Sequence, residues 1–85
     1  MAMDSKWAVQ RMVQRLVESI PGALVVDGKT VFIGASFSSG EYKVTSTDLN
    51  GEFSVSGHNP EIAENLFRDA VSAAKKKGRE IRPVW

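Results

Sequence analysis

The sequence contains no cysteine and a single histidine, His58. The first absence excludes disulfide bonds, thiolate catalysis and cysteine-based zinc sites. The second excludes a metal site built from several histidines. We therefore expect a chain without a metal or cofactor, whose function depends on ordinary surface contacts.

The chain also lacks long apolar runs and a strong excess of charge. No stretch approaches the ~20 apolar residues of a membrane span, and the first residues lack the pattern of a signal peptide. We therefore expect a cytoplasmic location without membrane contact. The net charge of +1 gives no global attraction to nucleic acid.

The length of 85 residues predicts one small domain, residues 1–85. A chain of this size buries only about 60–65% of its unfolded surface. Because that leaves a modest core, we expect a protein partner or a second copy, as in a homodimer, to contribute some of the stability.

Two segments have the apolar spacing of amphipathic helices. The first covers residues 5–20 and ends at Pro21-Gly22. The second follows Asn59, a good N-cap, has Pro60 at its first position and ends near Gly78. The expected buried stripes are Val9, Met12, Val13, Leu16, Val17 and Ile20, and then Ile62, Ala63, Leu66, Phe67, Ala70, Val71 and Ala74.

Turn signals between the helices separate four expected strands, near residues 23–27, 29–37, 41–47 and 52–56. Asp27-Gly28 is a two-residue hairpin signal, because a type I′ turn needs positive φ at both positions. The loops at Ser39-Gly40 and at 48–51 give registers that agree on one inward face. That inward set is Val31, Ile33, Ala35, Phe37, Tyr42, Val44, Ser46, Phe53 and Val55, and the buried Ser46 should need a hydrogen-bond partner. The outward set is Val25, Thr30, Phe32, Gly34, Ser36, Lys43, Thr45, Thr47, Ser54 and Ser56.

These elements predict an α+β fold in the order α-β-β-β-β-α. The sheet is a four-stranded antiparallel meander with both helices packed on one face, because only one face is apolar. Residues 79–85 are either a short fifth strand or a docked tail, and Pro83 would confine such a strand to an edge.

Two aromatic residues, Trp7 and Phe32, occupy positions that the pattern predicts to be exposed to solvent. Trp7 lies opposite the apolar stripe of the first helix, one turn from Arg11, and Phe32 lies on the outward face of the sheet. Because exposed aromatics often anchor interfaces, we interpret the chain as a small non-enzymatic binding or regulatory module acting through protein–protein contacts. The expected contact residues are Trp7, Arg11, Val25, Phe32, Lys43, Thr45, Thr47 and Ser54. Such a module is compatible with a phage or mobile-element source.

A nucleic-acid-binding protein is the alternative. Basic residues crowd the end of the chain, and others lie on the first helix. If the two regions were neighbours they would form a patch for phosphates, although lysines at a helix C-terminus also complement the helix dipole. The residues of this alternative are Arg15, Lys75, Lys76, Lys77, Arg79 and Arg82.

An enzyme would have to be built around His58, which precedes the second helix. Asp48 or Glu61 could then orient the imidazole as a general base requires. No spacing in the sequence fixes a contact between these residues, so a loop histidine is the simpler interpretation and we expect no enzymatic activity.

Residues 30–85 resemble the core of HicB-type antitoxins, in which a turn like "TDLNG" and a helix start like "SGHNPEIAENL" follow a hairpin. The matching residues are Asp48, Leu49, Gly51, Gly57, Ala63 and Leu66. This resemblance implies pairing with a small toxic ribonuclease, but the family's turn prolines are absent here. The front, residues 16–36, resembles the opening of roadblock-type dimerisation domains. Each resemblance covers part of the chain and the two imply different folds, so we assign neither family.

Overall fold

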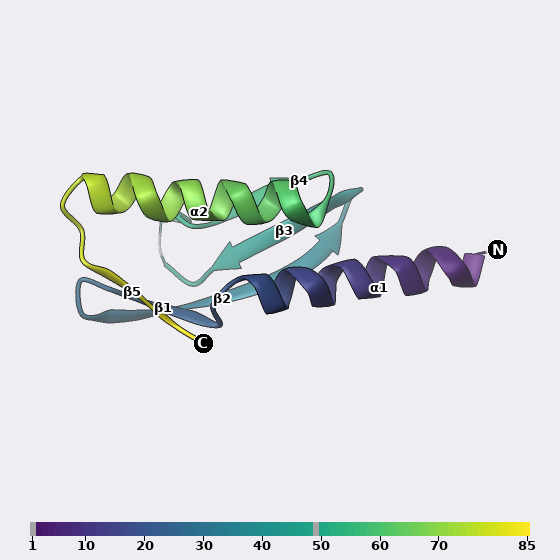
Figure 1. The fold of residues 1–85 in the computed structure, drawn as a ribbon, viewed down its shortest axis with the longest axis horizontal. Coiled ribbons are helices and arrows are strands. Elements are labelled where there is room, and N and C mark those ends of the chain that lie inside the picture. Colours follow the sequence, from purple (N-terminus) through teal and green to yellow (C-terminus); the bar gives the residue numbers. More distant parts are fainter. Residues whose placement is uncertain (1, 49) are drawn as a thin grey trace.

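The computed structural model describes residues 2–48 and 50–85, with side chains from residue 7 onward. It confirms the expected α+β fold (Figure 1). The elements are α1 (Ala2–Ser19), β1 (Ala23–Val26), β2 (Lys29–Ser38), β3 (Glu41–Ser46), β4 (Val55–Gly57), α2 (Pro60–Lys76) and β5 (Ile81–Val84). The five strands form one antiparallel sheet in the order β4-β3-β2-β1-β5, so the C-terminal segment is an edge strand.

The tight turns follow from the residues that favour positive φ. Asp27 and Gly28 have φ values of 51° and 85°, and Ser39 and Gly40 have values of 54° and 79°. Both turns therefore have positive φ at the two central positions, as a type I′ hairpin requires. The β2–β3 register pairs Phe37 with Tyr42 and Ile33 with Ser46 through the intervening residues, as expected.

The fourth strand differs from the prediction, since it covers Val55–Gly57 rather than 52–56. The Asp48 carboxylate accepts hydrogen bonds from the Ser46 hydroxyl and, over 2.9 Å, from the Glu52 amide. These bonds hold the residues after β3 in a loop, so the chain rejoins the sheet only at Val55. The bond to Asp48 also gives the Ser46 hydroxyl the hydrogen-bond partner that we expected it to need.

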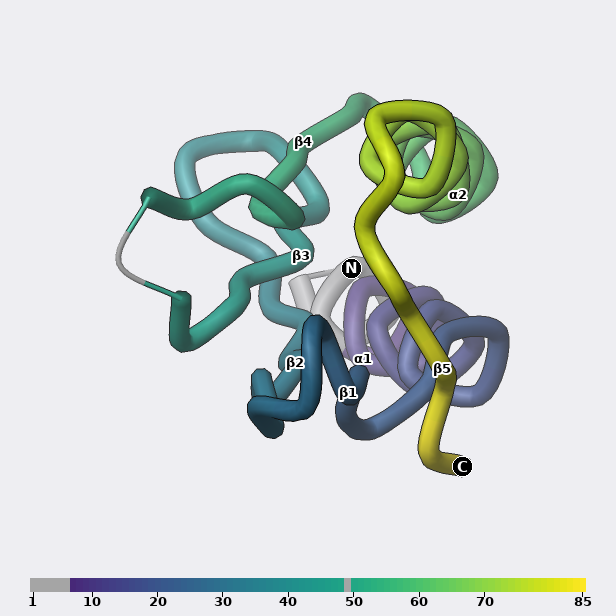
Figure 2. Tube along the Cα trace, turned by 90° about the vertical axis from the view of Figure 1, so that its left-hand side faces the viewer, coloured from purple at the N-terminus to yellow at the C-terminus, as the bar shows by residue number. Residues whose placement is uncertain are grey.

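Both helices lie on the same face of the twisted sheet, here called the inner face (Figure 2). α2 packs on β3, β4 and β5, and α1 packs on β2 and α2. The buried core is Leu16, Ile20, Leu24, Val26, Val31, Tyr42, Val44, Phe53, Ala63, Phe67, Ala74 and Ile81.

Part of each expected helical stripe is exposed. Met12 and Val17 of α1, and Ile62 and Leu66 of α2, were expected to be buried and are not. α1 extends past the ends of β2 and β3, which gives the molecule extents of 48 × 20 × 19 Å (Figure 1). α2 packs through the small residues Ala63 and Ala74 with Phe67 between them, so its contact is narrow and the flanks of the stripe face solvent.

Candidate binding surfaces

The face of the sheet opposite the helices, here called the outer face, carries an apolar row across three strands. Phe32 in β2 lies opposite Ala23 in β1, and Ala23 lies opposite Val84 in β5. Phe32 is 62% exposed and Val84 is 47% exposed. Val25 is half-buried in the next row, between Thr30 and Arg82. This apolar row, defined as Ala23, Phe32 and Val84, extends the surface that the sequence centred on Phe32 and Val25.

The polar half of the outer face lies over β2, β3 and β4. Lys43 is half-buried between Ser36 and Ser56 in the strand register. Thr45 lies over Gly34, where an added Cβ would sit 3.5 Å from the threonine hydroxyl oxygen. Both residues therefore occupy the face on which the sequence placed them.

Two of the expected contact residues, Thr47 and Ser54, accept hydrogen bonds from the backbone of the same chain through their hydroxyls. The Thr47 hydroxyl accepts a hydrogen bond from the Phe32 amide over 3.0 Å. The Ser54 hydroxyl accepts one from the Ser46 amide over 3.1 Å. Both side chains are exposed, but these bonds give them a structural task that strand alternation alone does not indicate.

Trp7 and Arg11 form a separate surface. Trp7 is 65% exposed, and together with Arg11 and Met12 it lines a shallow hollow on α1. Because α1 packs on the inner face, the structure does not bring this pair together with Phe32. The expected contact residues thus divide between two surfaces.

Arg79 is paired with carboxylates of the same chain. Its Nε donates to Asp27 over 3.1 Å, and its Nη1 donates to Glu52. These bonds, the one to Asp27 first, raise the pKa of Arg79. The pKa of Asp27 is lowered by the hydrogen bond from the Glu80 amide and then by Arg79. The guanidinium is therefore engaged in holding β5 to the β1–β2 turn and to the loop after β3.

The remaining basic residues do not form one patch. Lys75, Lys76 and Lys77 lie at the C-terminal end of α2. Arg15 instead lines a hollow with Glu61 and Glu64 at the opposite, acidic end of that helix. Arg82 lies in β5, in register with Val25. The two basic regions are not neighbours, so the juxtaposition on which the nucleic-acid interpretation depended is not formed.

The residues suggested for a general base, His58 with Asp48 or Glu61, all lie in the described part of the chain and are not joined by hydrogen bonds. His58 is exposed beside Asn59, the N-cap of α2. Burial opposes ionisation of Asp48, but hydrogen bonds from the Ser46 hydroxyl and the Glu52 amide outweigh it and lower the pKa of Asp48. Among the described residues, no hydrogen bond joins His58 to Asp48 or to Glu61.

Sequence reasoning missed the part of the surface that β5 creates. Val84 joins Phe32 only because β5 pairs with β1, and no local pattern specifies that pairing. The alternation within "IRPV" was the available signal, since it puts Arg82 and Val84 on one face of any strand.

Comparison of the chain with protein-family models, with curated proteins and with solved structures finds no match. In the part of the chain that the structure describes, neither helix is long and apolar enough to cross a membrane.

Proposed function

We propose that this chain is a small non-enzymatic binding module of the cytoplasm, and that the outer face of its sheet contacts a partner protein. The observation that supports this proposal is the apolar row, in which Phe32 and Val84 are exposed on a face that neither of the described helices covers. An aromatic side chain that becomes buried on binding, surrounded by polar groups, is typical of an interface centre.

The charges of the outer face indicate the partner. Lys43 and Arg82 lie on this face, and Glu41 is its one acidic residue within the described strands, at the β2–β3 turn. A second copy packed face to face would bring the cations together, which disfavours a symmetric homodimer through this surface. The surface instead fits a partner with an apolar patch bordered by Asp or Glu side chains.

Capture from a lysate of the source cell, compared across matched variants, tests the proposal. Phe32→Ser should reduce capture of the partner at least about tenfold, as expected for a central aromatic. Trp7→Ser changes an equally exposed aromatic on α1 and should leave capture unchanged. Arg82→Glu should weaken capture, and higher salt should reduce the difference between Arg82→Glu and the unmodified protein.

Three outcomes would overturn parts of the proposal. Equal capture by the Phe32 and Trp7 variants would remove the outer face as the contact surface. Loss of capture with Trp7→Ser alone would move the contact to α1. Sedimentation equilibrium showing a dimer that Phe32→Ser dissociates would replace the acidic partner with a second copy.

A further inference from the structure

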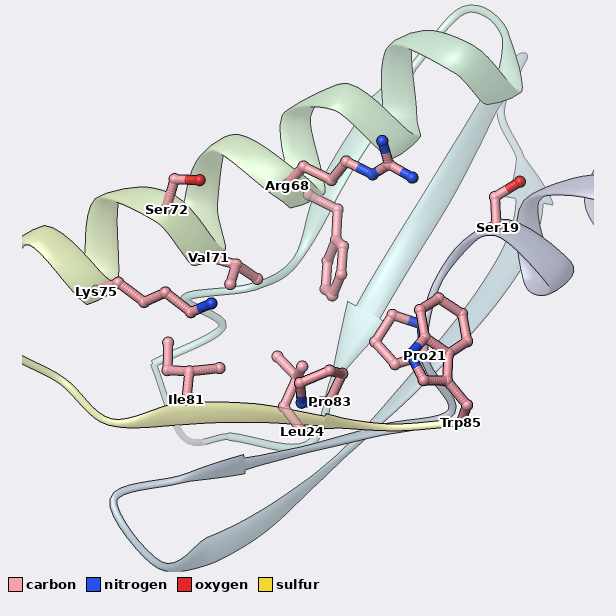
Figure 3. A pocket seen from close by; sticks show the side chains of 11 residues that line it. Ser19, Pro21, Leu24, Arg68, Val71, Ser72, Lys75, Ile81, Pro83 and Trp85 are labelled. Atoms are coloured by element: carbon pink, nitrogen blue, oxygen red, sulfur yellow. The ribbon is translucent and has the colours of Figure 1, made fainter.

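A groove that differs chemically from the outer face lies on the inner face, between α2 and the β1–β5 edge of the sheet (Figure 3). Its volume is about 280 Å³. Val71 of α2 and Ile81 and Pro83 of β5 contribute apolar walls. Trp85, which is 76% exposed, closes one end beside Pro21, as Figure 3 shows.

The groove exists because the helices cover the inner face unevenly. α2 packs chiefly over β3 and β4 and meets β5 only lightly. α1 ends at Ser19, at the margin of the groove. Pro83 has no backbone N–H to donate at the edge strand, which disfavours the pairing of a further strand there. A small molecule is therefore a better occupant than an extended peptide, and the volume lies just below the ~300–1,000 Å³ of typical ligand pockets.

The charged side chains that line the groove are of one sign. Among the described residues in its lining, these are Arg68 and Lys75, and no acidic side chain is present. Figure 3 shows the Lys75 ammonium reaching into the space between α2 and Ile81. Arg68 is paired with Glu64 over 3.0 Å, but an i,i+4 ion pair on a helix surface is weak, so a ligand carboxylate can compete for the guanidinium.

We propose that this groove binds a small amphipathic carboxylate, that is, a molecule with an aliphatic or aromatic body and one carboxylate group. The body packs between Val71, Pro83 and the Trp85 indole, and the carboxylate accepts a hydrogen bond from the Lys75 ammonium. Burial of apolar surface supplies the affinity, and the charge-assisted bond selects the anion over a neutral or cationic molecule of the same shape. This site is independent of the outer face.

Tryptophan fluorescence gives a direct test with hexanoate, hexan-1-ol and hexylammonium at constant ionic strength. The chain has two tryptophans, so a Trp7→Phe variant leaves Trp85 as the single reporter. Hexanoate should shift the Trp85 emission to shorter wavelength, with half-saturation at or below about 1 mM. Hexan-1-ol should bind at least about threefold more weakly, and hexylammonium should give no saturable shift.

The neighbouring lysines of α2 provide matched variants. Lys75→Gln should weaken hexanoate binding about three- to tenfold, whereas Lys76→Gln, outside the groove, should leave it unchanged. Val71→Phe fills the groove and should abolish the shift, with circular dichroism confirming the fold. Equal responses to the three ligands, equal effects of the two lysine variants, or no saturable shift by about 10 mM hexanoate would each overturn the proposal. If Val71→Phe does not fold, the ligand series and the lysine pair still decide.

Discussion

The Phe32 amide donates a hydrogen bond to the Thr47 hydroxyl over 3.0 Å, and the Thr47 amide donates to the Phe32 carbonyl over 3.1 Å. The last β2–β3 pair before this point is Ile33 with Ser46, so the threonine side chain supplies the acceptor where β3 leaves the sheet. The backbone that carries the exposed aromatic is therefore held by a side chain that sequence reasoning assigned to partner contact.

Thr47→Val should destabilise the protein by about 0.5–1.5 kcal/mol, because valine keeps the branched shape but removes the acceptor for the Phe32 N–H. Urea denaturation measures this change as a shift of the midpoint. Thr47→Ser retains the hydroxyl and should recover most of the loss. Thr45→Val, in the same strand, is the matched control and should change stability by less than about 0.5 kcal/mol. Equal losses for Thr47→Val and Thr45→Val would contradict the structural role of the Thr47 hydroxyl.

Gly57 allows α2 to approach β4. A Cβ at this position would lie 2.6 Å from Ile62 Cγ2 and 3.0 Å from the Ala63 amide nitrogen. Gly57→Ala should therefore push the first turn of α2 from the sheet and cost about 1–3 kcal/mol, as overpacking does. Gly22→Ala meets no atom within 4 Å and should be neutral or slightly stabilising. Thermal unfolding of the two variants compares them directly, and similar melting temperatures would refute the close approach.

The N-cap of α2 offers a third matched pair of variants. The Asn59 side chain accepts a hydrogen bond from the Ile62 amide over 2.9 Å. Asn59→Ala should cost about 0.5–2 kcal/mol, because it leaves a helix N-terminal donor without this partner. Asn65→Ala replaces an exposed asparagine inside the same helix with a better helix former and should not destabilise. Asn59→Asp should keep the cap, so a loss as large as that of Asn59→Ala would argue against capping.

The features that the sequence predicted correctly are those specified by nearby residues. The turns at Asp27-Gly28 and Ser39-Gly40 follow from φ preferences, and the β2–β3 register follows from the second turn. The Asn59 cap needs residues only three positions apart. Each of these features depends on residues close together in the sequence, so residue propensity and spacing were sufficient to predict it.

The features that the sequence did not predict depend on contacts between distant segments. The Arg79–Asp27 pair joins residues 52 positions apart, and no pattern near Arg79 indicates that its charge is used within the fold. The apolar row needs β5 beside β1. The exposure of Met12 and Leu66 depends on where each helix meets the sheet, which amphipathic spacing leaves undetermined. The candidate surfaces were therefore predicted in part for the outer face and not at all for the inner groove.

Asp27 should make stability depend on pH in the acid range. Its pKa in the folded protein is lowered by the Glu80 amide, which donates over 3.0 Å, and then by Arg79. A carboxyl whose folded pKa lies below its unfolded value of about 3.9 stabilises the fold at higher pH. That contribution is complete above the unfolded pKa and is lost as the pH falls through the folded pKa.

Asp27→Asn isolates this charge effect, because asparagine tolerates the φ of 51° and its side-chain oxygen can still accept the hydrogen bond from the Glu80 amide. The melting temperature of the unmodified protein should exceed that of Asp27→Asn at pH 6, and the difference should shrink steadily toward pH 2.5. Raising the salt to about 0.5 M at pH 6 should also reduce it, because the pair is exposed and screened. A difference that stays constant from pH 6 to 2.5 would mean that Asp27 acts through turn geometry rather than through its charge.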